Sequence, residues 1–214
     1  MGKIIDKEAH KRRGFLFILS SPSGVGKTTL ATMLKEKHSF VLSTSVTTRS
    51  PRPGEVDGVH YHFRTLEQFE DDRKKGKFLE YAKVHGNYYG TLASTVEDAL
   101  KEGRDILFDI DYQGVKQLQE KITQDVVSIF ILPPSKEELR RRLELRAQDS
   151  AEVIERRIAN AAHEIENAFI YDYVLINENL EQCYQTLEAI YCAEQHKRKR
   201  NFFWKDLSAQ FLAS

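Results

Sequence analysis

Residues 21–28 read Ser-Pro-Ser-Gly-Val-Gly-Lys-Thr and bring together residue types that can hold a phosphate group. Gly24 and Gly26 allow the backbone to curl so that several N–H groups point at one anion. Lys27 would reach the outer phosphates of a bound nucleotide, and the hydroxyl of Thr28 would bind a magnesium ion, as in the Walker A loop. The segment therefore predicts a nucleotide site.

The residues on either side of this loop support the prediction. An apolar run at 15–19 precedes it, and a helix-like stretch begins at Thr28. A strand, a glycine loop and a helix form the context that a phosphate site needs, because the helix presents its positive end to the anion. Ser21 stands where the Walker pattern has its first glycine, so the strict pattern fails at one position. A glycine turn that binds nothing would leave the Gly-Lys-Thr sequence unexplained.

A second phosphate site is predicted in the segment at 47–54, Thr-Thr-Arg-Ser-Pro-Arg-Pro-Gly. Arg49 and Arg52 lie three residues apart on a backbone that two prolines restrict. Guanidinium groups bind phosphate oxygens in a bidentate manner, and a stiff loop loses less entropy when it aims them. The alternative is a solvated basic loop, which we would favour in a chain without the first phosphate site.

Two carboxylates end an apolar segment at 106–111. Asp109 stands where a Walker B carboxylate would hold Mg²⁺, directly or through water. The alternative is a strand end that enters solvent. Asp111 begins an Asp-Tyr-Gln-Gly sequence that matches the DxxG element of GTPases, but the Asn-Lys-x-Asp guanine signature of those proteins occurs nowhere in the chain.

Hydrophobic patterns predict the elements that must position these residues. Short β-rich apolar runs at 15–19, 106–111, 126–132 and 173–176 alternate with helix-like segments, the first at about 28–38 and the last at about 179–196. This alternation is typical of an α/β fold with a doubly wound parallel sheet, whose ligands bind at the carboxyl ends of the strands.

Residues 41–95 predict a small α+β insertion in this core. A β-like run at 40–46, a short strand at 60–63 and a hairpin at 78–89 are expected there. Capping boxes predict four helix starts. They pair Thr65 with Gln68, Ser94 with Glu97, Ser135 with Glu138 and Asp149 with Glu152.

The composition of the chain limits the kinds of partner that the protein is expected to bind. Among 214 residues, 32 Lys and Arg balance 32 Asp and Glu, so no overall field would recruit nucleic acid or an anionic membrane. The apolar run at 15–19 is too short for a signal peptide or a membrane span, and the two cysteines predict neither a disulfide framework nor a metal site. His60, His62 and His85 likewise predict no metal site. We expect a cytoplasmic protein without nucleic-acid or membrane partners.

Several of these motifs together resemble the guanylate kinases, from about Gly14 to Cys192. The resemblance depends on five stretches, at 22–28, 47–55, 86–90, 109–111 and 131–135. It implies a P-loop NTPase core with an inserted GMP-binding subdomain and a helical lid. The implied parts are an N-terminal extension at 1–13, a kinase domain at 14–192 with its core at 14–40, 96–133 and 166–192, the GMP-binding subdomain at 41–95, the lid at 134–165, and a C-terminal tail at 193–214.

The resemblance also implies the reaction, ATP-dependent phosphorylation of GMP and dGMP with Mg²⁺ as the cofactor. The implied ATP-binding residues are Ser21, Pro22, Ser23, Gly24, Val25, Gly26, Lys27, Thr28 and Thr29. The implied GMP-binding residues are Ser45, Arg49, Arg52, Tyr61, Glu80, Tyr89, Thr91 and Asp111. The implied catalytic residues are Lys27, Arg49, Arg146 and Arg157, and the implied Mg²⁺ ligands are Thr28 and Asp109. Family members often have serine at the position of Thr91 and glycine at that of Ala147.

Some assignments keep an alternative. A related kinase for another phosphorylated acceptor, such as a ribose bisphosphate, would have no use for the base-reading Ser45 and Glu80. A second alternative is a guanylate-kinase-like module that has no catalytic activity and binds protein partners. Such a module would not need to keep the Gly-Lys-Thr sequence of the phosphate loop. Most of the arginines at 140–142, 146, 156 and 157 are expected on the solvated faces of two helices, and the basic run at 197–200 is expected to complement the dipole at the end of the last helix. Aromatic residues at 202–204 are expected to pack the tail onto the body or onto a partner subunit, the latter making a homo-oligomer.

Overall fold

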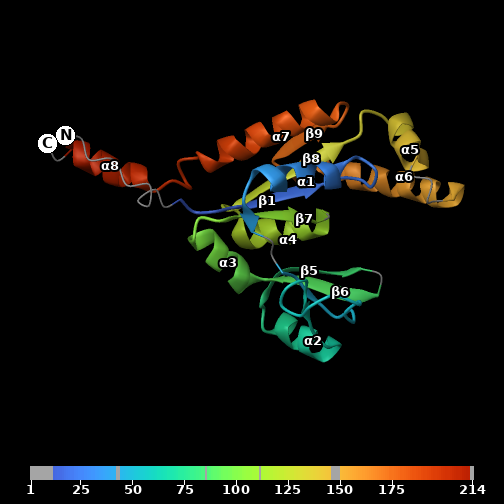
Figure 1. Ribbon diagram of the computed structural model, residues 1–214, viewed down its shortest axis with the longest axis horizontal. Helices are drawn as coiled ribbons and strands as arrows, with labels where there is room; N and C mark the ends of the chain where they lie inside the picture. Colours follow the sequence, from blue (N-terminus) through green and yellow to red (C-terminus); the bar gives the residue numbers. More distant parts are fainter. Residues whose placement is uncertain (1–11, 42–43, 85, 111, 146–149, 213–214) are drawn as a thin grey trace.

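The computed structural model describes residues 12–41, 44–84, 86–110, 112–145 and 150–212. Its centre is a five-stranded sheet in the order β2-β7-β1-β8-β9, in which every neighbouring pair is parallel (Figure 1). The strands are β1 (Leu16–Ser20), β2 (Phe40–Val41), β7 (Asp105–Asp109), β8 (Val126–Leu132) and β9 (Tyr173–Ile176). The doubly wound parallel sheet predicted from the sequence is confirmed.

The central strand β1 is buried on both faces, which explains its unbroken apolar sequence. Leu16 and Ile18 point into one hydrophobic cluster, and Phe17 and Leu19 point into another on the opposite face. Helices cover both faces (Figure 1). The first face is covered by α3 (Ala93–Lys101) and α4 (Tyr112–Ile122), and the second by α1 (Lys27–Lys37) and α7 (Leu180–Gln195).

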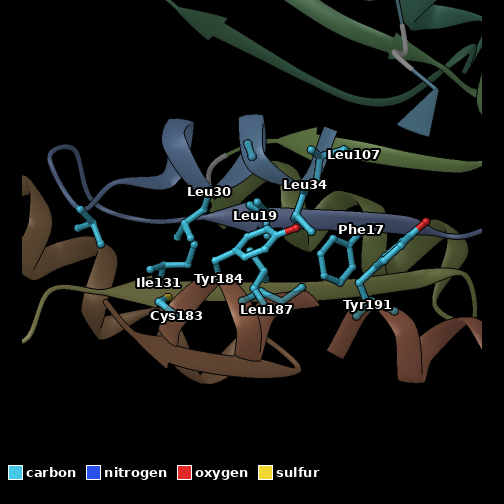
Figure 2. Close-up of a cluster of buried hydrophobic side chains, with 14 of the residues drawn as sticks. Phe17, Leu19, Leu30, Leu34, Leu107, Ile131, Cys183, Tyr184, Leu187 and Tyr191 are labelled. Carbon is cyan, nitrogen blue, oxygen red and sulfur yellow. The ribbon is translucent and has the colours of Figure 1, made fainter. Parts of the chain in front are cut away.

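Figure 2 shows how the second cluster is assembled. Leu30 and Leu34 of α1 and Leu187 and Tyr191 of α7 lie around Phe17 and Leu19 of β1, and all six side chains are almost fully buried. Leucines four residues apart lie on one side of a helix, so each helix presents an apolar stripe to the sheet. The cluster holds α1, and therefore the loop before it, at the carboxyl end of β1.

A second, smaller sheet lies beyond α4 (Figure 1). Its order is β4-β3-β6-β5, with parallel pairing of β3 and β4 and antiparallel pairing elsewhere. Its elements fall within 41–95, where the sequence predicts the insertion. They are β3 (Val46–Thr47), β4 (His62–Phe63), α2 (Leu66–Lys74), β5 (Phe78–Val84) and β6 (Asn87–Leu92). The predicted run at 40–46 divides between the two sheets, because β2 belongs to the first.

Two helices follow β8 at the carboxyl end of the central sheet. They are α5 (Lys136–Leu145) and α6 (Ala151–Glu166), and a short 3-10 helix (Ala168–Ile170) connects them to β9. Leu139 and Leu143 of α5 and Ile154 and Ile158 of α6 are buried in the same cluster as β1. These helices correspond to the segment at 134–165 that the resemblance implies as a lid.

The predicted helix caps have mixed outcomes. The Thr65–Gln68 capping box is present in full, and Ser135 accepts from the Glu138 N–H at 3.1 Å. The Ser94–Glu97 box is wrong. Helix α3 begins at Ala93 with no side-chain cap, because β6 runs directly into it and leaves Ser94 inside the first turn. The carboxylate of Glu97 instead forms an ion pair with Arg13 at 2.8 Å.

The start of α6 also differs from its prediction. Ser150 caps this helix by accepting from the Val153 N–H, while the predicted cap Asp149 lies outside the described residues. Glu152 occupies the first turn, where a carboxylate complements the helix dipole. The hairpin at 78–89 is confirmed by the pairing of β5 with β6.

The C-terminal segment has two features that the sequence did not predict. Arg200, in the basic run that follows α7, is only 1% exposed. It forms a buried ion pair with Glu194 at 3.2 Å and lies 4.3 Å from the Phe15 ring centre. A further helix that the sequence did not predict, α8 (Phe203–Leu212), then projects away from the body (Figure 1). Its last residues, Phe211 and Leu212, are largely exposed. No helix in the described ranges has the length and apolarity needed to cross a bilayer.

Candidate active site

The loop between β1 and α1 has the backbone shape that a phosphate site requires. Gly24 and Gly26 have φ angles of 94° and 102°, in the left-handed region that favours glycine. Helix α1 begins at Lys27, one residue before the predicted start, and has no acidic residue in its first turn. The unpaired N–H groups of that turn and the helix dipole favour an anion there. Residues 20–28, with Ile110 and Glu164, line a hollow of about 370 Å³.

Two polar side chains support this loop from behind. Asn177, which follows β9, is 3% exposed and donates from Nδ2 to the Val25 carbonyl at 2.7 Å. Arg142 of α5 donates to the same carbonyl at 3.3 Å and to the Asn177 carbonyl at 3.0 Å. The Val25 carbonyl is thereby held by two side chains from distant parts of the sequence. Arg142 is therefore an exception among the arginines of this segment, most of which are expected on solvated helix faces.

The glycines of the loop are needed for space as well as for conformation. A side-chain carbon on Gly26 would lie 2.7 Å from Nδ2 of Asn177. One on Gly24 would lie 2.9 Å from a terminal carbon of Leu143 in α5. Both distances are shorter than real contacts of such carbons, so α5 and Asn177 fit the loop only because it has no side chains at these positions.

The predicted second phosphate site is centred on Arg49. Its Nη2 lies 2.8 Å from a carboxylate oxygen of Glu55, and its guanidinium lies 5.4 Å from the Tyr61 ring centre. The ring centres of Tyr61 and Tyr89 are 6.1 Å apart. The structure therefore brings these three predicted residues together. The side chain of Arg52 is exposed, and its backbone N–H donates to Glu55 at 2.7 Å.

Glu55 was not among the predicted site residues. The Arg49 guanidinium and the Arg52 N–H lower the pKa of its carboxyl group to about 2. Because the folded pKa is depressed, the contact with Arg49 is present at and above the ordinary carboxyl pKa and is lost as pH falls through about 2. Glu55 therefore remains charged beside Arg49 at physiological pH. Its position three residues after Arg52 in a Pro-Gly turn is the signal that could have revealed it.

Three of the predicted base-reading residues lie in one row across the small sheet. The register pairs Glu80 of β5 with Thr91 of β6. It also pairs Val46 of β3 with Gly90, which puts Ser45 beside Thr91 when the register is continued by one residue. The Thr91 hydroxyl donates to a Glu80 carboxylate oxygen at 2.7 Å. Glu80 is 8% exposed and Thr91 is 1% exposed.

The remaining predicted residues lie near the carboxyl end of the central sheet. Asp109 ends β7 and is paired with Leu19 of β1, directly before the phosphate loop. Arg157 of α6 donates to the Ser23 hydroxyl of that loop at 3.2 Å. Thr28 and Thr29 are exposed in the first turn of α1. Asp111, Arg146 and Ala147 lie outside the described residues.

The donor set near the loop suits a hard cation. The hydroxyl oxygen of Thr28 is a ligand type that Mg²⁺ takes together with nucleotide phosphates and water. Within the described part of the chain, no three His, Cys, Asp or Glu side chains form a metal-binding group. The residues present fit an ion that arrives with a nucleotide, because phosphate and water supply most of its ligands.

Comparison with known proteins identifies the arrangement. The family model described as guanylate kinase matches residues 13–194. The chain belongs to the guanylate kinase family. The guanylate kinase of Bartonella henselae is 55% identical over 197 residues, which cover 92% of this chain and 89% of that protein. That of Rhizobium etli is 50% identical over 202 residues, 94% of this chain and 92% of that protein.

A solved structure is also similar. The crystal structure of guanylate kinase from Anaplasma phagocytophilum superposes with a TM-score of 0.70 at 39% identity, covering 92% of this chain and 95% of that one. Membership of the guanylate kinase family makes this chain a nucleotide kinase with a P-loop NTPase fold, which confirms the class of enzyme predicted from the sequence. The family reaction is the ATP-dependent phosphorylation of GMP to GDP.

Gly26→Ala tests whether the loop geometry controls catalysis. A methyl group at this left-handed position would collide with Asn177 and displace the loop amides. A misplacement of about 1 Å can cost roughly 100-fold in rate, so we expect kcat/KM for ATP to fall by about that factor. Steady-state kinetics at saturating GMP would measure it.

Gly76→Ala is the matched control. Gly76 also has a positive φ, of 66°, but no atom lies within 4 Å of the added carbon. This variant should lose a little stability and keep its kinetics. Equal kinetic losses in both variants would show that backbone strain, rather than displacement of the phosphate loop, explains the effect.

Proposed function

We propose that this enzyme transfers the γ-phosphoryl group of ATP to GMP and to dGMP in the presence of Mg²⁺, with the predicted residues in the roles below. The observation that carries the assignment of the acceptor is the buried Glu80 carboxylate, bonded to Thr91 in a row that also contains Ser45. The guanine ring has donors that suit this acceptor, and a sugar has no such edge.

The donor half of the site is the hollow above the phosphate loop. The amides of residues 21–29 and the α1 dipole bind the ATP phosphates, and Lys27 stabilises the charge on the outer ones. Thr28 and Asp109 hold Mg²⁺, which neutralises phosphate charge when it is bound. The support of the loop by Asn177 and Arg142 favours this role, because amides fixed in advance need no reorganisation during transfer.

The acceptor half holds the GMP phosphate with Arg49, Arg52, Tyr61 and Tyr89. Arg49 donates one N–H to Glu55 and one to the Ser50 carbonyl, at 2.7 Å, and its guanidinium also interacts with the Tyr89 side chain, so a bound phosphate would share the guanidinium with these groups. The guanidinium also lies over the aromatic rings of Tyr61 and Phe63, which restricts its plane. A phosphate oxygen held there attacks in line, and no covalent intermediate on the protein is needed.

Glu80 reads the guanine base. Its carboxylate can accept from both N1–H and the exocyclic amine of guanine, a pair of donors that adenine does not offer. Ser45, Thr91 and Asp111 complete the base site in this proposal. Because the carboxylate is buried, an adenine ligand would leave it without those partners, and this penalises AMP.

Arg146 and Arg157 are proposed to bring positive charge over the transferring group. The contact of Arg157 with Ser23 supports this, because it brings α6 against the phosphate loop. Mobile cations suit phosphoryl transfer, and closure excludes water that would otherwise hydrolyse ATP. The division into a core, a GMP-binding subdomain at 41–95 and a lid at 134–165 belongs to this proposal. The cytoplasmic location, the lack of nucleic-acid or membrane partners and any self-association stay predictions.

A substrate panel tests the reaction directly. With ATP and Mg²⁺ present, ADP formation should depend on GMP or dGMP and be far slower with AMP, UMP or a ribose bisphosphate, because only guanine satisfies Glu80. A coupled assay would measure the five rates in parallel. Equal use of AMP and GMP would contradict the base-reading role, and preference for the sugar phosphate would favour the alternative kinase.

Lys27→Ala tests the donor site. Removing one group that stabilises transition-state charge typically costs about 100- to 1,000-fold, and we expect kcat to fall by at least this much. Circular dichroism and thermal unfolding should show an intact fold, because Lys27 is only partly buried. Lys35→Ala, further along α1, is the control and should keep full activity. An active Lys27→Ala enzyme would refute the donor site.

Glu80→Gln tests the base site. Glutamine keeps an oxygen for Thr91 but replaces the other acceptor with a donor that opposes guanine. Because hydrogen bonds to a charged acceptor are worth about 1.5–3 kcal/mol, we expect KM for GMP to rise about 10- to 100-fold. KM for ATP should stay the same. Glu67→Gln, on the exposed face of α2, is the control. A parallel rise in both KM values would contradict a role confined to GMP.

A further inference from the structure

Helix α4 of the core contacts β5 of the small sheet through side chains that bond to its backbone. The Tyr81 N–H donates to Oε1 of Gln117 at 3.1 Å, and Nε2 of Gln117 donates to the Tyr81 carbonyl at 3.1 Å. Lys121, one turn further along α4, donates to the Phe78 carbonyl at 2.8 Å. A single amide side chain therefore satisfies both backbone groups of one β5 residue.

This contact takes the place of a neighbouring strand. The small sheet ends at β5, and none of the strands in the described part of the chain lies along its outer edge. The backbone groups on an edge are normally left to water or to another chain. Gln117 and Lys121 lie four residues apart, on one face of α4, and this face covers the edge. Figure 1 shows α4 between the central sheet and β5.

The packing of β5 strengthens the connection. Its pairing with β6 shifts register between Phe78 and Glu80. Phe78 is buried in the small-sheet cluster, whereas the next side chain, Leu79, is buried in the core cluster with Val115 and Leu118. Two adjacent residues therefore anchor β5 in two different cores. Glu80 and Tyr81 follow directly.

The same face of α4 borders the Glu80 carboxylate. A side-chain carbon on Gly114 would lie 3.6 Å from Oε2 of Glu80. Gly114 precedes Gln117 by three residues, so both lie on the side of α4 that faces β5. The other carboxylate oxygen accepts from Thr91. Glu80 is thus fixed by β6 on one side and bordered by α4 on the other.

We propose that Gln117 is a positioning residue for the choice of nucleobase. It fixes the edge strand β5 against α4 and thereby fixes the orientation of the Glu80 carboxylate. This inference rests on the proposed reading of guanine by Glu80. Hydrogen bonds weaken steeply away from their preferred distance and angle, so a carboxylate that must meet two donors at once depends on a fixed backbone. Gln117 supplies that restraint at the adjacent residue without touching the substrate.

Gln117→Met is the test, because methionine has a similar shape and helix propensity but bonds to neither backbone group. The substrates are GMP and inosine monophosphate (IMP), which lacks the exocyclic amine and so offers Glu80 one donor fewer. Losing two hydrogen bonds of about 0.5–1.5 kcal/mol each should raise KM for GMP about tenfold. The preference for GMP over IMP should shrink, and KM for ATP should stay unchanged. Glu120→Met, on the exposed side of the same helix, is the matched control.

Amide hydrogen exchange supplies a readout independent of turnover. The Tyr81 N–H should exchange faster in Gln117→Met than in the parent protein, because its acceptor is gone. Gln117→Glu keeps that acceptor and loses only the donor, so its exchange rate and KM for GMP should lie between the two. If Gln117→Met does not fold, Gln117→Glu takes its place as the test variant.

The outcomes distinguish the guanine-reading role of Glu80 from the positioning role of Gln117. A parent enzyme that does not distinguish GMP from IMP refutes the reading of guanine by Glu80. A parent enzyme that does so, with a folded Gln117→Met variant that keeps the same KM for GMP and the same preference, refutes the positioning role. A variant in which KM for ATP rises as much as KM for GMP also refutes it, because the residue would then act on the whole fold.

Discussion

The structure depends most on one stretch of backbone, the loop whose amides must converge on an anion. Such a loop is unfavourable for ordinary residues, since Gly24 and Gly26 both have positive φ angles. It is stable because the chain surrounds it. Asn177 and Arg142 bind the Val25 carbonyl, and Leu143 fills the space beside Gly24. Helix α5 is therefore joined to the loop by polar and apolar contacts together. Both helices of the proposed lid at 134–165 therefore contact the loop, α5 through these groups and α6 through the side chains of Arg157 and Ser23, so a movement of that lid would be transmitted to the phosphate site.

The parallel sheet brings these parts together. Strand β1 lies between β7 and β8. The chain leaves β1 through α1 on one face of the sheet and enters β8 through α4 on the other face. Where the strand order diverges in this way, the loops that follow the strands separate and leave a crevice for a ligand. The phosphate loop follows β1, Asp109 ends β7, and α5 follows β8. Residues from three distant parts of the sequence therefore meet at one end of the sheet, and the burial of β1 on both faces is what fixes their distances.

Local patterns in the sequence were enough to predict the loop, the core strands, the hairpin and one complete capping box, because neighbouring residues determine each of them. The loop support was not predictable, since Arg142 and Val25 are 117 residues apart and either residue alone looks ordinary. The burial of Arg200 was not predictable for the same reason, because its position in a basic run gives no sign of the contacts with Glu194 and Phe15. Ser94 failed as a cap because the preceding strand enters the helix without a break. The roles implied for Ser45, Glu80 and Arg49 came from resemblance, and the sheet register explains why residues so far apart in sequence can act together.

The two ends of the small sheet differ in how they are held, one by contacts within the insertion and the other by contacts with the core. At the phosphate end, Arg49 is held by Glu55, Ser50 and the rings of Tyr61 and Phe63, all of which lie within 14 residues of it in the same segment. At the base end, β5 is held by Leu79 in the core cluster and by Gln117 and Lys121 of α4. A movement of the small sheet against the core would carry the arginine loop as a unit, whereas the base-reading strand would have to keep or break its bonds to α4. With the roles proposed above, recognition of phosphate would be a local property of the insertion, and recognition of the base would be the part that is physically connected to the core.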